Sequence, residues 1–207
     1  ASFLLARLLE EAPVLADPAN ASRTLLFDPG ALDWSRQLLD VFGVARDHLP
    51  RCVPTRHGYG HLRAGQRRIP LAACTGDQSA AAFACGPPSK SVALVNGGTG
   101  AFVQRVAPAG LRLPDGLLLS VLRSDANGAT RSHEGTVNGA GSAIDWLAGS
   151  VALDVERALP ALKAPPAENA PLFMNGVGGL GAPFWQPDFP IEFVGGGDDL
   201  QLLTAVV

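Results

Sequence analysis

Residues 69–84 read IPLAACTGDQSAAAFA, and this stretch decides the fold class. The apolar run from Ile69 to Thr75 predicts a strand, and the alanine-rich run from Ser79 to Ala84 favours a helix. Gly76-Asp77-Gln78 stands where the strand gives way to the helix. Strand ends carry the sites of many α/β sheets, so Asp77 is a candidate ligand-facing carboxylate. The same carboxylate can instead cap the helix, and taken alone the cap is the favoured interpretation.

A glycine-rich hairpin follows further along the chain. Val92–Val95 and Ala101–Val106 predict two strands, and Asn96-Gly97-Gly98-Thr99-Gly100 forms the tip between them. Glycines let successive backbone N–H groups converge on an anion, and a threonine hydroxyl suits a phosphate oxygen. The Walker pattern GxxxxGK[ST] is absent, so a plain hairpin turn is an equal alternative.

A second glycine-rich turn, Asn138-Gly139-Ala140-Gly141-Ser142, precedes a predicted helix. In that helix Ala143, Ile144 and Leu147 share one face. The free N–H groups and the dipole of a helix start favour a phosphate group. Close packing of the helix is the alternative reason for the glycines.

The rest of the chain predicts a mixture of helices, strands and loops. The expected elements are an apolar helix at Phe3–Leu9, a helix that Asp33 caps and Gly43 ends, a loop or irregular strand over Arg51–Pro70, a strand at Leu117–Leu122, a loop around a short helix at Leu159–Ala170, a strand at Pro171–Met174 and a helix that starts at Asp198. This last helix has a start and no stop signal. We therefore expect a piece of a longer protein, with a compact native chain as the alternative.

Composition excludes several classes of protein. Of the 207 residues 47% are apolar and 17% charged, which is enough apolar side chain for a core and excludes disorder as the main state. The formal charge of −3 has no block of like charges, so neither nucleic acid nor an anionic membrane is an expected partner. No apolar run approaches the roughly 18 residues that span a bilayer. We expect a cytoplasmic protein.

Cysteine and histidine patterns predict no metal site. Three cysteines without a CxxC spacing indicate reduced thiols. The four histidines, His48, His57, His61 and His133, also lack metal-ligand spacing.

The order of these elements resembles the FGGY family of carbohydrate kinases, and the glycerol kinase branch most closely. The matching segments lie in order across nearly the whole chain and are jointly specific. They are Asp17-Pro18-Ala19-Asn20-Ala21-Ser22-Arg23-Thr24 with Leu25, Phe27 and Leu32-Asp33-Trp34; Gly76-Asp77-Gln78 with Ala80 and Ala81; Gly98-Thr99-Gly100 with Phe102; Glu134-Gly135 followed by Gly141, Ile144 and Trp146-Leu147; and Gly179-Leu180-Gly181-Ala182-Pro183-Phe184-Trp185.

This resemblance implies an α/β protein of the actin-like, ribonuclease-H-like ATPase fold. Such a two-domain kinase phosphorylates a hydroxyl of a sugar or polyol in the cleft between its domains. ATP and Mg²⁺ are the implied cofactors, and glycerol or a related carbohydrate is the implied substrate. The oligomeric state stays open, with a homodimer or a homotetramer as the options.

The family also implies roles for individual residues. Asp77 corresponds to the catalytic base, which binds substrate as well, and Gln78 to a substrate contact. Gly98 and Thr99 correspond to the hairpin that binds the ATP phosphates. Gly141 and Asp145 correspond to nucleotide contacts, although glycerol kinases usually carry Gln at the latter position. No residue is assigned as a metal ligand.

In the same comparison, residues 1–88 correspond to the end of the N-terminal, substrate-binding domain. Residues 89–207 correspond to the beginning of the C-terminal, nucleotide-binding domain. The Asp-x-Gly-Thr hairpin with which family members begin is not in this sequence. We therefore expect the piece to be catalytically inert alone.

Several departures leave the substrate open. Gly97 stands where glycerol kinases usually have Tyr, and Gln186–Pro190 differs from their sequence after the Pro-aromatic-Trp motif. A non-catalytic sugar-binding or regulatory module derived from such a kinase is the main alternative. A thiol hydrolase that uses Cys74 with His57 or His61 is a weaker one, because the sequence places no oxyanion hole or orienting partner.

Overall fold

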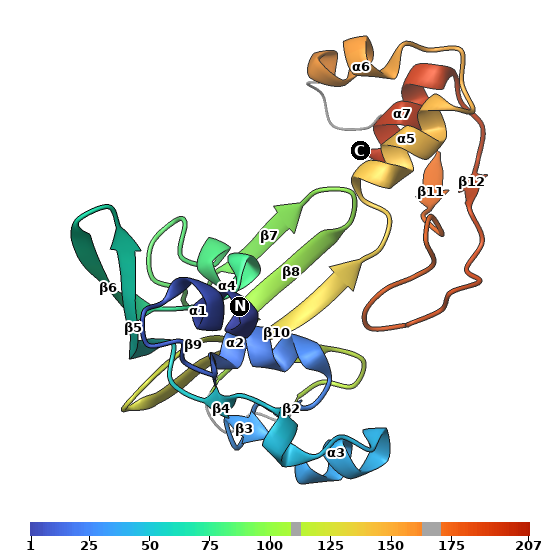
Figure 1. The fold of residues 1–207 in the computed structure, drawn as a ribbon. Coiled ribbons are helices and arrows are strands. Elements are labelled where there is room, and N and C mark those ends of the chain that lie inside the picture. The colour runs from blue at the N-terminus through green and yellow to red at the C-terminus, as the bar shows by residue number, and fades with distance from the viewer. Residues whose placement is uncertain (109–112, 163–170) are drawn as a thin grey trace. The chain divides into compact units, whose positions relative to one another are not determined.

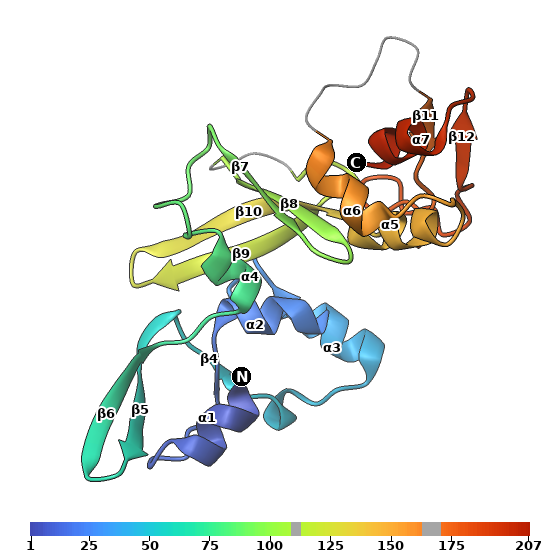
Figure 2. The ribbon, with the colours of Figure 1, turned by 90° about the horizontal axis from the view of Figure 1, so that it is seen from above.

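The computed structural model describes residues 1–108, 113–162 and 171–207. The chain divides into two compact units. In Figures 1 and 2 the colour follows the chain from the N-terminus to the C-terminus. Unit 1 comprises Ala1–Ala93, Arg105–Arg112 and Leu119–His133, and unit 2 comprises Leu94–Gln104, Leu113–Leu118 and Glu134–Val207. The domain boundary expected at residue 88 concerns a complete kinase and stays a prediction.

Unit 1 contains short helices and three small sheets. Its elements are α1 (Ser2–Leu8), β1 (Leu15–Ala16), α2 (Pro18–Ala21), η1 (Ser22–Thr24), β2 (Phe27–Asp28), β3 (Asp33–Trp34), α3 (Arg36–Phe42), η2 (Arg46–His48), β4 (Arg51–Cys52), β5 (Arg56–Ala64), β6 (Arg67–Ala73) and α4 (Asp77–Ala81). Strands β1 and β4 pair in parallel, whereas β2–β3 and β5–β6 are antiparallel pairs. Thus the segment that carries Asp77 leaves the end of a hairpin strand.

A four-stranded sheet and a helical subdomain complete the chain. The sheet has the order β7-β8-β10-β9 and consists of β7 (Ala93–Gly97), β8 (Ala101–Val106), β9 (Leu118–Asp125) and β10 (Gly128–Val137). After it come α5 (Gly141–Ala148), α6 (Val155–Ala158), η3 (Leu159–Ala161), β11 (Leu172–Met174), β12 (Glu192–Val194) and α7 (Asp199–Val206). Strands β11 and β12 form an antiparallel pair.

The described residues form three apolar clusters between these elements. In unit 1, Phe27 and Trp34 of the β2–β3 pair meet edge to face and pack with buried Val121 of β9. A second cluster in the same unit joins Leu5 of α1 to Tyr59 of β5. In unit 2, Leu147 of α5 packs on Leu203 of α7, and both are almost fully buried. Burying a leucine side chain contributes about 1.5–3 kcal/mol, so these contacts dominate the local stability.

Helix ends follow the local sequence in most places. The helix expected to end at Gly43 does so, with that glycine at φ 65° in the left-handed region. Its N-cap is Ser35, not Asp33, because Asp33 is taken into β3, where it pairs with Asp28. At α7, Asp198 and Gln201 form a capping box with two bonds of 2.9 Å, which confirms the expected helix start.

Other expectations need correction. The region 51–70 contains β4, all of β5 and the start of β6, so most of it is strand, with a register shift between Arg56 and Gly60. The helix expected from Ser79 begins earlier, at Asp77, and ends at Ala81. The longest strand, β10, has no counterpart among the expected elements. In the stretch 159–170 the short helix is η3, and residues 163–170 lie outside the described part.

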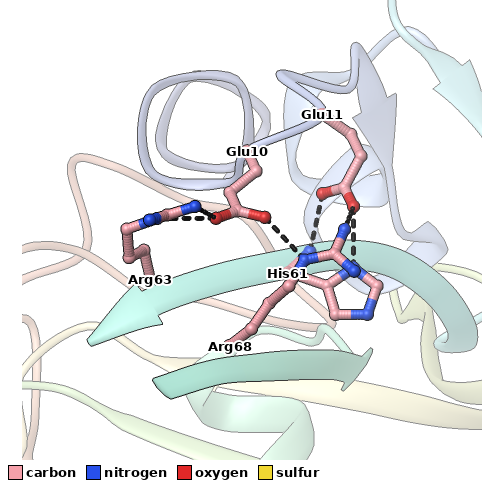
Figure 3. Close-up of polar contacts among 5 residues, drawn as sticks. All are labelled: Glu10, Glu11, His61, Arg63 and Arg68. Atoms are coloured by element: carbon pink, nitrogen blue, oxygen red, sulfur yellow. Dashed lines mark hydrogen bonds and ion pairs between the residues drawn. The ribbon is translucent and has the colours of Figure 1, made fainter. Parts of the chain in front are cut away.

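A cluster of charged and polar side chains links the turn after α1 to the β5–β6 hairpin, as Figure 3 shows. Its members are Glu10, Glu11, His61, Arg63 and Arg68. Glu10 accepts from Arg63 Nε at 2.8 Å and from Arg68 Nε at 2.6 Å. Glu11 accepts from the backbone N–H of His61 at 2.7 Å and lies 2.7 Å from His61 Nδ1. All five side chains come from two segments about 50 residues apart, so these bonds secure a long-range contact.

Candidate active-site elements

Asp77 stands at the first position of α4 with an exposed side chain. The N-cap residue is Gly76, and no side chain caps this helix. Asp77 Oδ1 accepts instead from the backbone N–H of Gln78 at 2.8 Å. Asp77 is therefore not the N-cap residue of α4, and its carboxylate accepts one amide of the first turn. The carboxylate is open to solvent at a strand-to-helix junction, and the Gln78 side chain beside it is half-buried.

The backbone on both sides of Asp77 is anchored within unit 1. Before it, the N–H of Cys74 donates to the carbonyl of Thr55 at 3.0 Å. After it, Ser79 Oγ donates to the carbonyl of Val121 at 3.1 Å, and both of these residues are buried. A carboxylate that must meet a reacting hydroxyl needs such a rigid support.

The glycine-rich hairpin tip forms as the sequence predicts. It lies between β7 and β8, and Gly97, Gly98 and Thr99 are exposed. A Cβ atom built on Gly97 would meet nothing within 4 Å, and one on Gly98 would meet only the Gly100 carbonyl at 3.8 Å. The outer side of the tip is therefore open, which fits a group as large as a phosphate.

The second glycine turn packs directly against this tip in unit 2. The backbone N–H groups of Ala140 and Ser142 donate to Thr99 O at 3.0 and 3.1 Å, and that of Gly141 donates to Gly98 O at 2.8 Å. The sequence predicts free N–H groups at this helix start. They are instead bound to the hairpin tip, so a nucleotide contact at Gly141 has to use other atoms.

The glycine-rich loop at residues 175–181 is hydrogen-bonded to the glycine turn at residues 138–142. Asn138 Nδ2 donates to the carbonyl of Gly178 at 2.9 Å, and Asn175 Nδ2 donates to that of Gly139 at 2.6 Å. Three glycine-rich segments that are separate in the sequence thus meet in unit 2. They are the hairpin tip, the start of α5 and the loop around residues 175–181.

Asp145 lies on α5 one helical turn after Gly141, so the two positions share a helix face. Its side chain is exposed. A carboxylate at this position would repel phosphate oxygens, whereas it could accept a hydrogen bond from a sugar hydroxyl or an amine. Its expected role as a nucleotide contact is compatible with that chemistry.

Cys74 does not have the surroundings of a catalytic thiol. Its Sγ lies 3.5 Å from Asp17 Oδ1, and burial, together with the Asp17 charge, raises the pKa of the thiol to about 11. His61 is bound to Glu11, and the His57 ring stacks edge to face with Tyr59. A protonated thiol beside a carboxylate is a poor nucleophile, which counts against the thiol hydrolase.

The described residues contain neither a cluster of metal ligands nor a helix that could cross a membrane. In the ranges 1–108, 113–162 and 171–207, no three His, Cys, Asp or Glu side chains are grouped so that they could hold a metal ion. Over the same ranges, every helix is too short or too polar to cross a membrane.

Comparison with known proteins identifies the class. Residues 1–84 match the model of the N-terminal domain of the FGGY family of carbohydrate kinases. The chain resembles this family over nearly its whole length, as the order of its motifs predicts. It is similar to a glycerol kinase of Geobacter sp., with 35% identity over 90% of this chain and 39% of the relative. Glycerol kinase 2 of Sulfolobus acidocaldarius is 29% identical over 90% of this chain and 38% of the relative. The chain thus spans less than half the length of these relatives.

Solved structures confirm the fold class. A Plasmodium falciparum glycerol kinase with ADP superposes with a TM-score of 0.83 at 23% identity, and the match covers 99% of this chain and 43% of that one. A xylulose kinase from Brucella ovis also superposes with a TM-score of 0.83, at 22% identity, and the match covers 99% of this chain and 44% of that one. The fold is that of the sugar kinases, the actin-like ATPase fold.

The burial of Asp17, Gln104 and Glu134 is not among the expectations from the sequence. Asp17 and Glu134 are both fully buried carboxylates, and Gln104 Nε2 donates to Glu134 at 2.6 Å. The preference of Asp for helix starts before Pro18 could have pointed to Asp17 as a cap. No local signal marks the Gln104–Glu134 pair, because it joins two strands 30 residues apart.

Proposed function

We propose that this chain is part of an ATP-dependent kinase that phosphorylates a hydroxyl of a sugar or polyol, with glycerol or a related carbohydrate as substrate. The exposed Asp77 carboxylate at the start of α4 is the observation that carries the proposal. The match of residues 1–84 to the N-terminal domain of the FGGY family supports it. The activity belongs to the complete protein that contains these 207 residues.

Asp77 acts as the general base in this proposal. Its carboxylate accepts the proton of the attacking hydroxyl as that oxygen bonds to the terminal phosphorus of ATP, and ADP leaves. Gln78, the next residue, binds the substrate. General base catalysis is typically worth about 10²- to 10⁴-fold in rate, and correct positioning of the hydroxyl contributes as much or more.

The open hairpin tip and the start of α5 form the nucleotide-binding part. Thr99 offers a hydroxyl to the phosphates, and the small Gly98 lets them approach the backbone. Gly141 keeps the helix close to the tip, and Asp145 binds the nucleoside. Mg²⁺ bound with ATP supplies neutralisation of the phosphate charge and is held mainly by the phosphates.

An assay of ADP release by the complete protein, with MgATP and a panel of polyols and ketoses, tests the proposal. We expect Asp77→Asn to lose about 10²- to 10⁴-fold in kcat and to keep nucleotide binding. Asp40→Asn is the control, because Asp40 is an exposed aspartate on α3 in the same unit. Near-normal turnover of Asp77→Asn would remove Asp77 from the role of base.

The nucleotide part is tested separately with Thr99→Val. A hydrogen bond to a charged group contributes about 1.5–3 kcal/mol, so the KM for ATP should rise about 10- to 100-fold. Thr99→Ser keeps the hydroxyl and should stay near the wild-type value. If the panel elicits no ADP release but a polyol still binds, the non-catalytic sugar-binding module becomes the better account.

A further inference from the structure

Asp17 is a buried carboxylate that the proposed function does not use. Its side chain is fully buried, and it caps α2 by accepting from the N–H groups of Ala19 at 3.0 Å and Asn20 at 3.2 Å. Asn20 Nδ2 donates a further bond to Asp17 Oδ1 at 2.6 Å. Because a buried charge is costly unless it is hydrogen-bonded, so many donors indicate a firmly held group.

One more donor reaches Asp17 from a distant part of the sequence. Cys74 Sγ donates to Asp17 Oδ1 over 3.5 Å, across 57 residues of sequence. Cys74 follows the end of β6 and stands three residues before Asp77. The start of α2 is thereby bonded to the segment that leads into the base.

The Asn20 side chain also lies near this turn, one step closer to Asp77. The nearest atom to a Cβ built on Gly76 is Asn20 Oδ1, at 4.0 Å. Asn20 is the residue whose amide is bound to Asp17. The Asp17–Asn20 pair is thus bonded to the strand-to-helix turn at Cys74, and the Asn20 side chain lies in the neighbourhood of Gly76.

We infer that Asp17 is a positioning residue for Asp77. It holds the segment before Asp77 through the Cys74 thiol, and Ser79 holds the other side of Asp77 through its bond to the Val121 carbonyl. A displacement of the base by about 1 Å can cost about 10²-fold in rate. This inference rests on the proposed role of Asp77.

The test compares Cys74→Ala with Cys74→Ser in the complete protein. Neither change touches the bonds between Asp17 and α2, so the helix cap is intact in both. Serine keeps a donor for Asp17, and alanine removes it. We expect Cys74→Ala to lower kcat about 10- to 100-fold, with the KM for ATP unchanged, and Cys74→Ser to stay within about twofold of wild type. Wild-type kcat in Cys74→Ala, or an equal loss in both variants, would overturn the inference.

Asp17→Asn tests the carboxylate itself. The amide keeps an oxygen for the α2 N–H groups but removes the negative charge beside Cys74. We expect the same loss of kcat, and alkylation of Cys74 at pH 9 should become severalfold faster because the thiolate is no longer opposed by a carboxylate. An unchanged alkylation rate, with that of Cys85 as internal reference, would contradict the contact. If Asp17→Asn does not fold, the comparison of Cys74→Ala with Cys74→Ser decides whether Asp17 positions Asp77.

Asp77→Asn separates the two proposals. If it keeps turnover, the assignment of Asp77 as base fails, while the Cys74 alkylation rates still report the contact with Asp17. If it loses turnover and both Cys74→Ala and Asp17→Asn keep wild-type kcat, the role of Asp17 fails and that of Asp77 stands.

Discussion

The backbone N–H of Gly141 donates to the carbonyl oxygen of Gly98 over 2.8 Å, so the first residue of α5 rests directly on the tip of the β7–β8 hairpin. A Cβ atom at position 141 would lie 2.7 Å from that same oxygen. Glycine is therefore required here for close approach of two backbones. Three backbone hydrogen bonds and one from Ser142 Oγ join this helix start to the tip and connect the two glycine motifs.

Gly141→Ala should consequently destabilise the protein. The methyl group forces the hairpin tip and α5 apart, and overpacking of this kind typically costs about 1–3 kcal/mol. Urea unfolding followed by circular dichroism measures the change. Gly149→Ala at the other end of α5 is the matched control, because its φ is −78° and the nearest atom to its Cβ is 3.6 Å away. Equal stabilities of the two variants would contradict the packing role of Gly141.

Gln104→Leu should destabilise unit 2. The change leaves the fully buried Glu134 carboxylate without the Gln104 amide at 2.6 Å, and loss of one such partner costs about 1–3 kcal/mol. The same unfolding experiment applies. Gln66→Leu, at an exposed position in the β5–β6 turn, should stay within about 0.5 kcal/mol of wild type. A neutral Gln104→Leu would mean that the bond to Gln104 adds nothing to the stability of this buried carboxylate.

Glu11 should titrate at unusually low pH. Hydrogen bonds from the His61 side chain and backbone lower the pKa of its carboxyl from 4.5 to about 2. A depressed folded-state pKa means that this stabilisation is present above about pH 4.5 and is lost as the pH falls towards 2. Carbon-detected NMR of the carboxyl measures the midpoint. His61→Ala removes the ring and should move the midpoint upwards, and a wild-type midpoint near 4.5 would contradict the geometry.

The three cysteines should differ in reactivity towards iodoacetamide at pH 8. Burial and the Asp17 charge raise the pKa of Cys74 to about 11, and burial with the Asp33 contact raises that of Cys52 to about 12. Cys85 is exposed. Since the thiolate is the reactive form, Cys85 should be labelled first. Peptide mass spectrometry gives the order, and labelling of Cys74 as fast as Cys85 would reopen the question of a reactive thiol.

Local sequence predicts the elements that depend on local chemistry. The capping box of Asp198 and Gln201 and the left-handed Gly43 need only neighbouring residues, and both form as expected. The hairpin tip at Gly97–Gly100 follows from the same kind of signal. The roles of Asp77, Gln78, Gly98, Thr99, Gly141 and Asp145 come from family resemblance and stay predictions.

Non-local pairing explains the failures. Strand β10 is rich in polar residues, and its burial of Ser132 and Glu134 depends on neighbouring strands. Strand β5 looks like a loop because it is polar and contains two glycines, yet pairing with β6 and burial of Tyr59 make it a strand. Asp33 is a good N-cap by type, but its pairing with Asp28 leaves that task to Ser35.

The sequence by itself determined the order of the motifs and the resemblance to the FGGY kinases, because residue types and short spacings encode them. Only the tertiary structure decided that the amides before α5 are bound to the hairpin tip and that Cys74 lies against Asp17. The first contact joins residues 43 positions apart, and the second joins residues 57 positions apart. Such contacts form only when burial of apolar surface brings distant segments together, and no local pattern records them.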